Sequence, residues 1–281
     1  MQSGGKPPHS KLKETTMPDN KMLILVAHAD DTEFLAGGTV AKFAAEGWEI
    51  VEVIATNNER GSFELPRETL IRDSEKEALA AARILGKKDV IFLGYPDGNL
   101  GDTPVNVLRE KFMRLIRQHR PQLVMTFDPW APFEPHPDHR QVAWAAVEAI
   151  FFSHMPLFHP EHLKQGLQPH LVAEVYYFAK ESNLVNKAVD ITPYVDKKIE
   201  ALCAHDSQMK LTIDDLKLAL EALGAKPELS AGLDRNNYQG MLTLMVKAWF
   251  GEVGKKHGVA FAEEFRCERA GGPIAAAVMG L

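Results

Sequence analysis

The chain has 281 residues, of which 45% are hydrophobic and 25% are charged, and its formal net charge at pH 7 is −6. These values are ordinary for a globular protein that buries a core, and the length fits one large α/β domain or two small ones. The sequence offers no basic field, so nucleic acid is not an expected partner. The two cysteines, Cys203 and Cys267, form no Cys-x-x-Cys motif, which favours a reducing cytoplasm.

The two ends of the chain differ from its middle in composition. Residues 1–20 are polar and contain no apolar signal-peptide core, so we expect a flexible tail there. Residues 270–281 are small and apolar, and we expect a second tail. The intervening residues 21–269 are expected to form a single α/β domain. No apolar run is long enough to span a bilayer, so no membrane anchor is expected.

The first predicted strand ends in metal-competent side chains. An apolar run over residues 22–27 predicts a buried parallel strand, and residues 33–43 predict a helix. His28, Asp30 and Asp31 stand between them, at the carboxyl edge where open α/β sheets bind ligands. Imidazole and carboxylate ligands suit zinc. The same residues also fit a simple helix N-cap beside a buried histidine, and this stretch alone leaves both interpretations open.

Strand and helix patterns alternate through the following residues. Strands are expected at 49–56, 89–93, 122–127 and 171–179, and helices at 67–85, 104–119 and 137–152. This alternation predicts a Rossmann-like α/β fold, with a mostly parallel sheet flanked by helices and joined by right-handed crossovers. Further helices are expected at 192–205, 212–224 and 234–253, with a short strand or edge segment at 263–266.

A second group of histidines follows the predicted strand at 122–127. A loop over residues 128–135 leads into His136-Pro137-Asp138-His139, where proline suits the first turn of a helix. His136 and His139 are three residues apart, so they share a face of that turn. This group lies at the same edge of the sheet as His28. The two groups together therefore predict a metal site there, although a lone His-x-x-His is a weak signal.

Residues 151–171 hold four more histidines among prolines, without a carboxylate at ligand spacing. We do not expect a metal site in this segment. Its apolar side chains favour a loop over the pocket, which could bind part of a substrate.

The two histidine motifs, Ala27-His28-Ala29-Asp30-Asp31-Thr32-Glu33 and His136-Pro137-Asp138-His139, resemble those of the PIG-L/LmbE-like deacetylases. Members of this family are zinc-dependent N-deacetylases of N-acetylglucosamine conjugates. Three supporting segments are similar to family patterns, and the resemblance covers about residues 20–210. They are the loop from Thr56 to Gly61, the turn from Leu93 to Gly98 and the segment from Lys198 to Gln208.

Three positions depart from the family pattern. Ala29 stands where the first motif usually has proline, and Asn58 stands where the loop after the second strand usually has glycine. Glu134 stands where some members have tyrosine, so an oxyanion-stabilising tyrosine from that position is not expected. The proline of the family pattern would contribute rigidity rather than chemistry. We therefore expect the metal ligands to be retained with alanine at position 29.

The resemblance implies a role for each residue of the two motifs. Zinc would be held by His28, Asp31 and His139, with water in the open position. Asp30 would be the general base. His136, as imidazolium, would stabilise the oxyanion, and Asp138 would orient a histidine from behind.

Two further residues are candidates for contacts with sugar hydroxyls. Arg72 and Asp97 match family positions on the helix and the turn that follow the second and third strands. Arg72 could equally form a surface pair with Glu75, three residues away on the same helix. Asp97 could be no more than a turn residue.

The expected function is therefore hydrolysis of the N-acetyl group of a small amino-sugar substrate, with metal-bound water as nucleophile. One alternative is a zinc amidase acting on another sugar- or thiol-conjugate amide. Less expected are a zinc-binding protein without chemistry and a non-catalytic nucleotide-binding protein, for which Gly37 and Gly38 lie too far into the helix. The sequence leaves open iron or cobalt in place of zinc, and homo-oligomerisation.

Overall fold

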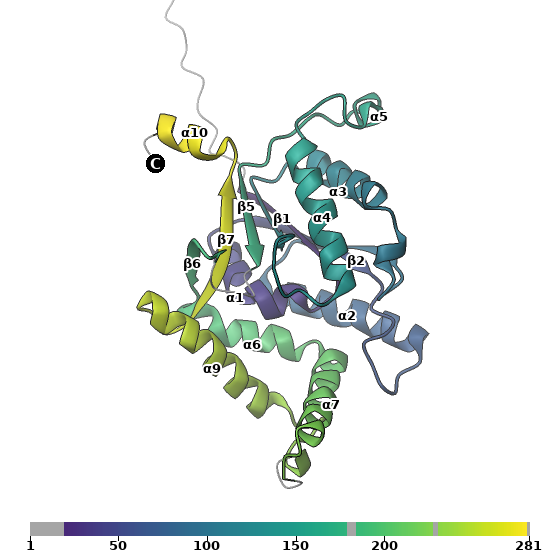
Figure 1. The fold of residues 1–281 in the computed structure, drawn as a ribbon, viewed down its shortest axis with the longest axis vertical. Coiled ribbons are helices and arrows are strands. Elements are labelled where there is room, and N and C mark those ends of the chain that lie inside the picture. The colour runs from purple at the N-terminus through teal and green to yellow at the C-terminus, as the bar shows by residue number, and fades with distance from the viewer. Residues whose placement is uncertain (1–19, 179–183, 227–229, 280–281) are drawn as a thin grey trace, which may run out of the picture.

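The computed structural model describes residues 20–178, 184–226 and 230–279. The expected N-terminal tail lies outside these residues, except for Asn20. The described strands form one seven-stranded sheet in the order β3-β2-β1-β4-β5-β7-β6 (Figure 1). The strands are β1 (Lys21–Val26), β2 (Glu49–Thr56), β3 (Asp89–Tyr95), β4 (Leu123–Phe127), β5 (Glu174–Phe178), β6 (Lys187–Asp190) and β7 (Ala262–Arg269).

Helices cover both faces of the sheet (Figure 1). Helices α1, α2 and α6 pack together on one face, and α3 and α4 pack together on the other. The described helices are α1 (Asp31–Ala45), α2 (Arg67–Leu85), α3 (Val105–His119), α4 (Pro137–Phe152), α5 (Pro160–Lys164), α6 (Val195–Cys203), α7 (Asp206–Ala222), α9 (Gln239–His257) and α10 (Gly272–Met279), with 3-10 turns at Leu100–Asp102 and Thr192–Tyr194. No helix of the described ranges has the length and apolarity to cross a membrane.

The predicted Rossmann-like architecture is confirmed. Strand β1 pairs in parallel with both β2 and β4, and its residues Met22–Val26 are at most 2% exposed because helices cover both faces. The chain leaves β1 toward β2 and leaves β4 toward β5, on opposite sides. The boundary between β1 and β4 is therefore a topological switch point, where a crevice opens beyond the carboxyl ends of the strands.

The C-terminal part differs from expectation. The short strand expected at 263–266 is present as β7, which is longer than expected and runs antiparallel between β5 and β6 rather than at the edge of the sheet. Strand β6, which forms that edge, was not predicted. In β7 the charged residue Glu263 is fully buried and paired with Lys198. The helix expected at 192–205 ends at Cys203, and α7 begins at Asp206, six residues before the expected start. The C-terminal tail forms α10 rather than an irregular end.

The prediction for residues 151–171 is wrong. Helix α4 begins at the carboxyl edge of the sheet and runs for 16 residues, about 24 Å, to the opposite edge. The segment after it is tied to that opposite edge, since His170 Nε2 contacts the carbonyl oxygen of Pro121, just before β4. It does not form a loop over the pocket.

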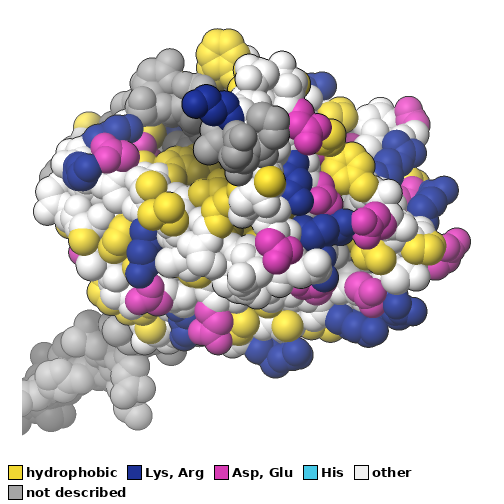
Figure 2. All heavy atoms as spheres, turned by 90° about the horizontal axis from the view of Figure 1, so that it is seen from below, with side chains coloured by type: hydrophobic (Ala, Val, Ile, Leu, Met, Phe, Trp, Pro, Cys, Tyr) yellow, Lys and Arg dark blue, Asp and Glu magenta, His cyan; other side chains and the backbone are white. Residues whose placement is uncertain are grey.

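The exposed face seen in Figure 2 mixes both signs of charge, with Lys and Arg side chains interspersed among Asp and Glu.

Candidate metal centre

The first half of the site is the turn between β1 and α1. Asp31 is the first residue of α1, and its Oδ2 accepts hydrogen bonds from the backbone N–H groups of Ala27 and His28, at 3.1 and 2.7 Å. The pKa of Asp31 lies well below its usual value, because His139 and His28 outweigh the effect of burial. The carboxylate therefore remains ionised, with Oδ1 free of these backbone contacts.

The second half is the first turn of α4. His136 is the N-cap residue, and its Nδ1 accepts the backbone N–H of Asp138 at 3.2 Å. Pro137 at the first helical position needs no N–H partner there. The His139 ring stacks on Phe127 at the end of β4, with ring centroids 4.2 Å apart. Strand end and helix start thus fix the direction of the His139 ring.

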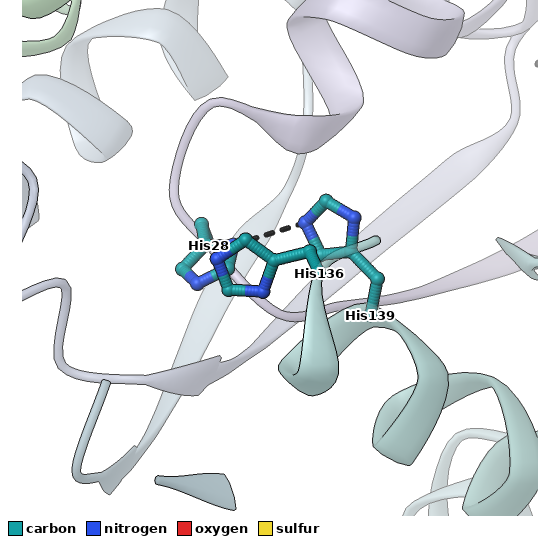
Figure 3. Close-up of side chains that lie close together, drawn as sticks. All are labelled: His28, His136 and His139. Carbon is teal, nitrogen blue, oxygen red and sulfur yellow. Dashed lines mark hydrogen bonds between the residues drawn. The ribbon is translucent and has the colours of Figure 1, made fainter. Parts of the chain in front are cut away.

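The two halves bring the rings of His28 and His139 together, with His136 beside them (Figure 3), and Asp31 lies next to both rings. His28 Nδ1 lies 3.2 Å from His139 Nε2. Asp31 Oδ1 lies 3.2 Å from His139 Nε2, and its Oδ2 lies 3.5 Å from His28 Nδ1. Four-coordinate metal bonds of about 2.0–2.1 Å imply donor separations of roughly 3.3–3.4 Å. The observed separations, which involve both oxygens of Asp31, are close to this spacing, so His28, Asp31 and His139 could hold a metal ion.

Carboxylates hold the other nitrogen of both histidines. His28 Nε2 lies 3.1 Å from Asp97 Oδ1 and 3.6 Å from Asp138 Oδ2. His139 Nδ1 lies 3.1 Å from Glu134 Oε1. Such carboxylate–histidine pairs fix the tautomer and orientation of metal ligands in known metal sites. Asp138 is itself anchored, because its two oxygens accept backbone N–H groups from the turn after β3.

His136 stands beside these ligands. A set of His28, His136 and His139 nitrogens also lies within 4.8 Å. However, Nδ1 of His136 is occupied as the cap of α4, so only Nε2 is available to the site. Its pKa is lowered by burial and by the two neighbouring histidines. This direction favours the neutral ring, and the imidazolium form expected from the sequence stays a prediction.

Asp30 lines the same cavity as the three donors. Burial and the charge of Asp31 raise its pKa, while His205 and His28 lower it. A carboxyl group with a raised pKa beside a metal site is suited to accept a proton near neutral pH. His205, which lies in the segment that resembles the family pattern, is fully buried, with Nε2 at 3.5 Å from Glu33.

The donors open into a cavity of about 530 Å³, within the range of about 300–1,000 Å³ that is typical of small-molecule sites. Its walls also include residues to which the sequence gave no catalytic, metal-binding or sugar-binding role, although several of them lie in the segments that resemble family patterns. Gln208 on α7 donates a hydrogen bond to the carbonyl oxygen of Gly61 at 3.1 Å, which closes α7 against the loop after β2. The added lining residues are Asn58, Arg60, Gly61, Gly98, Gln208, Leu211 and Asp215.

Comparison with known proteins identifies the family of this fold and site. Residues 23–150 match the family model described as PIG-L, GlcNAc-PI de-N-acetylase. The chain is 32% identical over 202 residues to the diacetylchitobiose deacetylase of Thermococcus kodakarensis, covering 70% of this chain and 73% of that protein. The chain belongs to the PIG-L family. The membership predicted from the two histidine motifs, and with it the activity of an amide hydrolase, is confirmed.

Other PIG-L relatives agree in length and fold. A 1D-myo-inositol 2-acetamido-2-deoxy-alpha-D-glucopyranoside deacetylase of Mycobacteroides abscessus is 28% identical over 252 residues, covering 75% of this chain and 89% of that protein. The structure of N,N′-diacetylchitobiose deacetylase from Pyrococcus horikoshii superposes with a TM-score of 0.72 at 28% identity, covering 89% of this chain and 84% of that one.

Two predicted site residues have other surroundings than expected. Arg72 is exposed, pairs with Asp73 and does not line the cavity. The expected sugar contact of Arg72 is therefore wrong for this structure. Asp97 does line the cavity, but Oδ1 contacts His28 and Oδ2 accepts the backbone N–H of Arg60. Its contacts assign it to holding His28 rather than to a sugar hydroxyl.

A further histidine group lies outside this PIG-L site. His159, Glu161 and His162 could by position hold a metal. However, His162 Nε2 contacts Glu110 and Nδ1 contacts Arg117, so both ring nitrogens are occupied. Glu161 nevertheless lies 2.8 Å from His159 Nδ1, so the expectation of no carboxylate at ligand spacing in this segment is wrong.

Proposed function

We propose that the protein removes the N-acetyl group from a small N-acetylglucosamine conjugate, using a zinc ion held by His28, Asp31 and His139. One observation carries the proposal. The three donor residues converge at separations close to those of tetrahedral bonds, while Asp30 and His136 stand beside them in the same cavity. A binding site without chemistry needs neither of the last two residues. Two free cysteines further favour a reducing cytoplasm.

A zinc ion held by His28, Asp31 and His139 would polarise the acetyl carbonyl and would make a bound water acidic enough to attack near neutral pH. Asp30 accepts the proton of that water and then transfers it to the leaving amine, which completes hydrolysis to acetate and a free amino sugar. His136 donates its Nε2–H to the oxygen that gains negative charge. Asp97, Asp138 and Glu134 hold the two histidine ligands in place from behind.

The substrate class follows from the named activities of the relatives and from the cavity. Both relatives described above act on amides of N-acetylated glucosamine, linked to a second sugar or to inositol. The inner cavity wall holds the catalytic groups, and the outer wall is built from α7 and the loop after β2. The acetyl group therefore enters toward Asp30, and the conjugated part of the substrate lies against Leu211 and Asp215.

The test is the release of free amine from N-acetylglucosamine, its short oligomers and an inositol-linked form. Enzyme treated with chelator is compared with the same enzyme after restoration of zinc, iron(II) or cobalt(II). The Asp30→Ala variant serves as control. We expect metal-dependent release that Asp30→Ala abolishes, and the rates rank substrates and metals. Stoichiometric metal without release from any substrate would redirect the proposal to another amide, and absence of metal binding would refute the site.

A further inference from the structure

Two of the three positions that depart from the family pattern, Ala29 and Asn58, contact each other. The backbone N–H of Ala29 donates a hydrogen bond of 3.0 Å to Oδ1 of Asn58, and the bond is buried. Ala29 is 1% exposed and Asn58 is 5% exposed. Ala29 stands between the ligand His28 and the general base Asp30. Asn58 belongs to the loop after β2 and lines the cavity.

Each departure would be unfavourable without the other. Proline, the usual residue of the family pattern at position 29, has no N–H and needs no partner. Alanine, unlike proline, has a backbone N–H. This N–H is buried in the structure, and a buried donor without a hydrogen-bond partner would be destabilising. Glycine, the usual residue at position 58, suits a positive φ. Asn58 has φ of 55°, a conformation that asparagine tolerates better than most residues. It therefore keeps the backbone of the loop and adds the acceptor.

The surrounding contacts show what the bond holds. The backbone N–H of Thr56 and its Oγ1 both donate to the carbonyl oxygen of Ala27, each at 2.9 Å. The Ala29–Asn58 bond lies two residues further along both segments. The end of β2 and the loop after it thus form hydrogen bonds with the turn both before and after His28. The peptide plane of Ala29 sets the direction in which Asp30 leaves the turn.

We propose that Asn58 is a positioning residue that takes over the role of the missing proline. Its side chain fixes the turn from His28 to Asp30, and so holds the general base beside the metal. Ala29 and Asn58 form one functional unit, and each requires the other. The activity readout of this inference rests on the proposed function, whereas its stability readout does not.

A double-mutant cycle tests the unit with the full chain. The variants are Asn58→Gly, Ala29→Pro and the double variant, which restores the family pattern. Asn99→Gly is the matched control, since Asn99 is an exposed loop asparagine whose side chain contacts Asp102 outside the cavity. For each variant, kcat, KM, bound metal and the melting temperature of the metal-free chain are measured.

We expect Asn58→Gly to lower kcat by about ten- to a hundredfold, with KM and bound metal little changed, since a small misplacement of a catalytic group costs that much. Its metal-free chain should melt about 2–4 °C lower, as an unpaired buried N–H implies. Ala29→Pro alone should also lower kcat, because the proline Cδ takes the place of the N–H and clashes with Oδ1 of Asn58, which lies 3.0 Å from that nitrogen. The double variant should return to within about threefold of wild-type kcat, as neighbouring sites that couple are not additive.

Three results would overturn the inference. Losses of the two single variants that simply multiply in the double variant would show that the residues act independently. A loss of metal parallel to the loss of kcat would make Asn58 a determinant of metal binding instead. A change no larger than that of Asn99→Gly would leave the bond without a role. If the wild type hydrolyses no substrate, the proposed function fails. The melting temperatures of the single and double variants still decide whether Ala29 and Asn58 are coupled.

Discussion

Replacement of Lys87 by methionine should be among the most destabilising substitutions in this fold. The Lys87 side chain is fully buried, and its Nζ donates to Glu33 Oε1 and Glu52 Oε2, each at 2.7 Å. Both carboxylates are also buried. Burial opposes the ionisation of Glu33, but Lys87 and His205 outweigh it and lower its pKa to about 2. Burial raises the pKa of Glu52, and this effect is larger than the opposite effect of the positive charge of Lys87, which lowers that pKa.

Two lines of reasoning give a similar magnitude. A pKa lowered from 4.5 to about 2 corresponds to about 3 kcal/mol in favour of the ionised carboxylate. Removal of one partner from a buried ion pair typically costs about 3–5 kcal/mol. We therefore expect Lys87→Met to lower the free energy of unfolding by about 3–5 kcal/mol, a large share of the roughly 5–15 kcal/mol typical of domains.

Equilibrium unfolding in urea at pH 8 and pH 5.5 measures this loss. The control is Lys88→Met, because Lys88 is 61% exposed and pairs with Glu49 at the surface. That pair should contribute about 1 kcal/mol or less. In Lys87→Met the two uncompensated carboxylates have folded pKa values above their unfolded ones. Protonation then favours the folded state, and the loss should shrink as the pH falls to 5.5.

A Lys87→Met variant as stable as Lys88→Met would refute the reasoning that a buried charge needs its partner. A second variant keeps the test independent of general packing effects. Lys87→Met combined with Glu33→Gln and Glu52→Gln removes the uncompensated charges, so it should recover more than half of the loss at pH 8. A further loss in this triple variant would show that methionine itself does not fit the site.

Three other predictions concern the site and its surroundings. His139→Ala should lose the metal, whereas His136→Ala should retain the metal and lose about a hundredfold or more in kcat, as removal of an oxyanion donor does. Metal analysis together with kinetics distinguishes the two variants. Equal loss of metal in both would contradict the proposed roles. Leu211→Trp should raise KM for a disaccharide more than for N-acetylglucosamine, with bound metal unchanged, and an equal effect on both substrates would show that α7 does not contact the conjugated part. Burial lowers the pKa of His162, so the unfolded chain binds more protons and stability should fall as the pH drops below about 6.5. In His162→Gln this part of the decline, up to about 1.4 kcal/mol per pH unit, should be absent, and identical pH profiles would argue against it.

Much of the fold could be predicted from hydrophobic patterns. The strand at Glu49–Thr56 and the helix at Arg67–Leu85 begin and end where expected, because burial, propensity and a terminal Gly86 with φ of 83° all agree there. Only the middle of strand β7 was predicted, and its place inside the sheet was not, because its buried glutamate has a lysine partner that is distant in the sequence. The 3.6-residue period also placed the start of α7 six residues late, since Asp206, Ser207 and Gln208 in its first turn are polar.

The residues predicted to bind the metal could be found from the sequence, whereas Glu134, one of the carboxylates that contact their histidines, could not. His28 and Asp31 are three residues apart, and His139 lies in a local motif of its own. Two short motifs at neighbouring strand ends meet in any parallel sheet of this order. The carboxylates behind the histidines lack such a constraint. Glu134 was noticed only as a departure from a tyrosine, yet its carboxylate contacts His139, and no spacing in the sequence distinguishes it from a loop residue.

The family match and part of the cavity wall lie in different parts of the chain. The match covers residues 23–150, which hold the candidate metal donors, Asp30 and His136. Helix α7 begins at Asp206, beyond the match, and nevertheless supplies Gln208, Leu211 and Asp215 to the cavity. Under the proposed function, Leu211 and Asp215 face the conjugated part of the substrate, whereas Gln208 belongs to a segment that resembles the family pattern. We therefore expect substitutions at Leu211 and Asp215 to change the preferred substrate while the candidate metal donors remain intact.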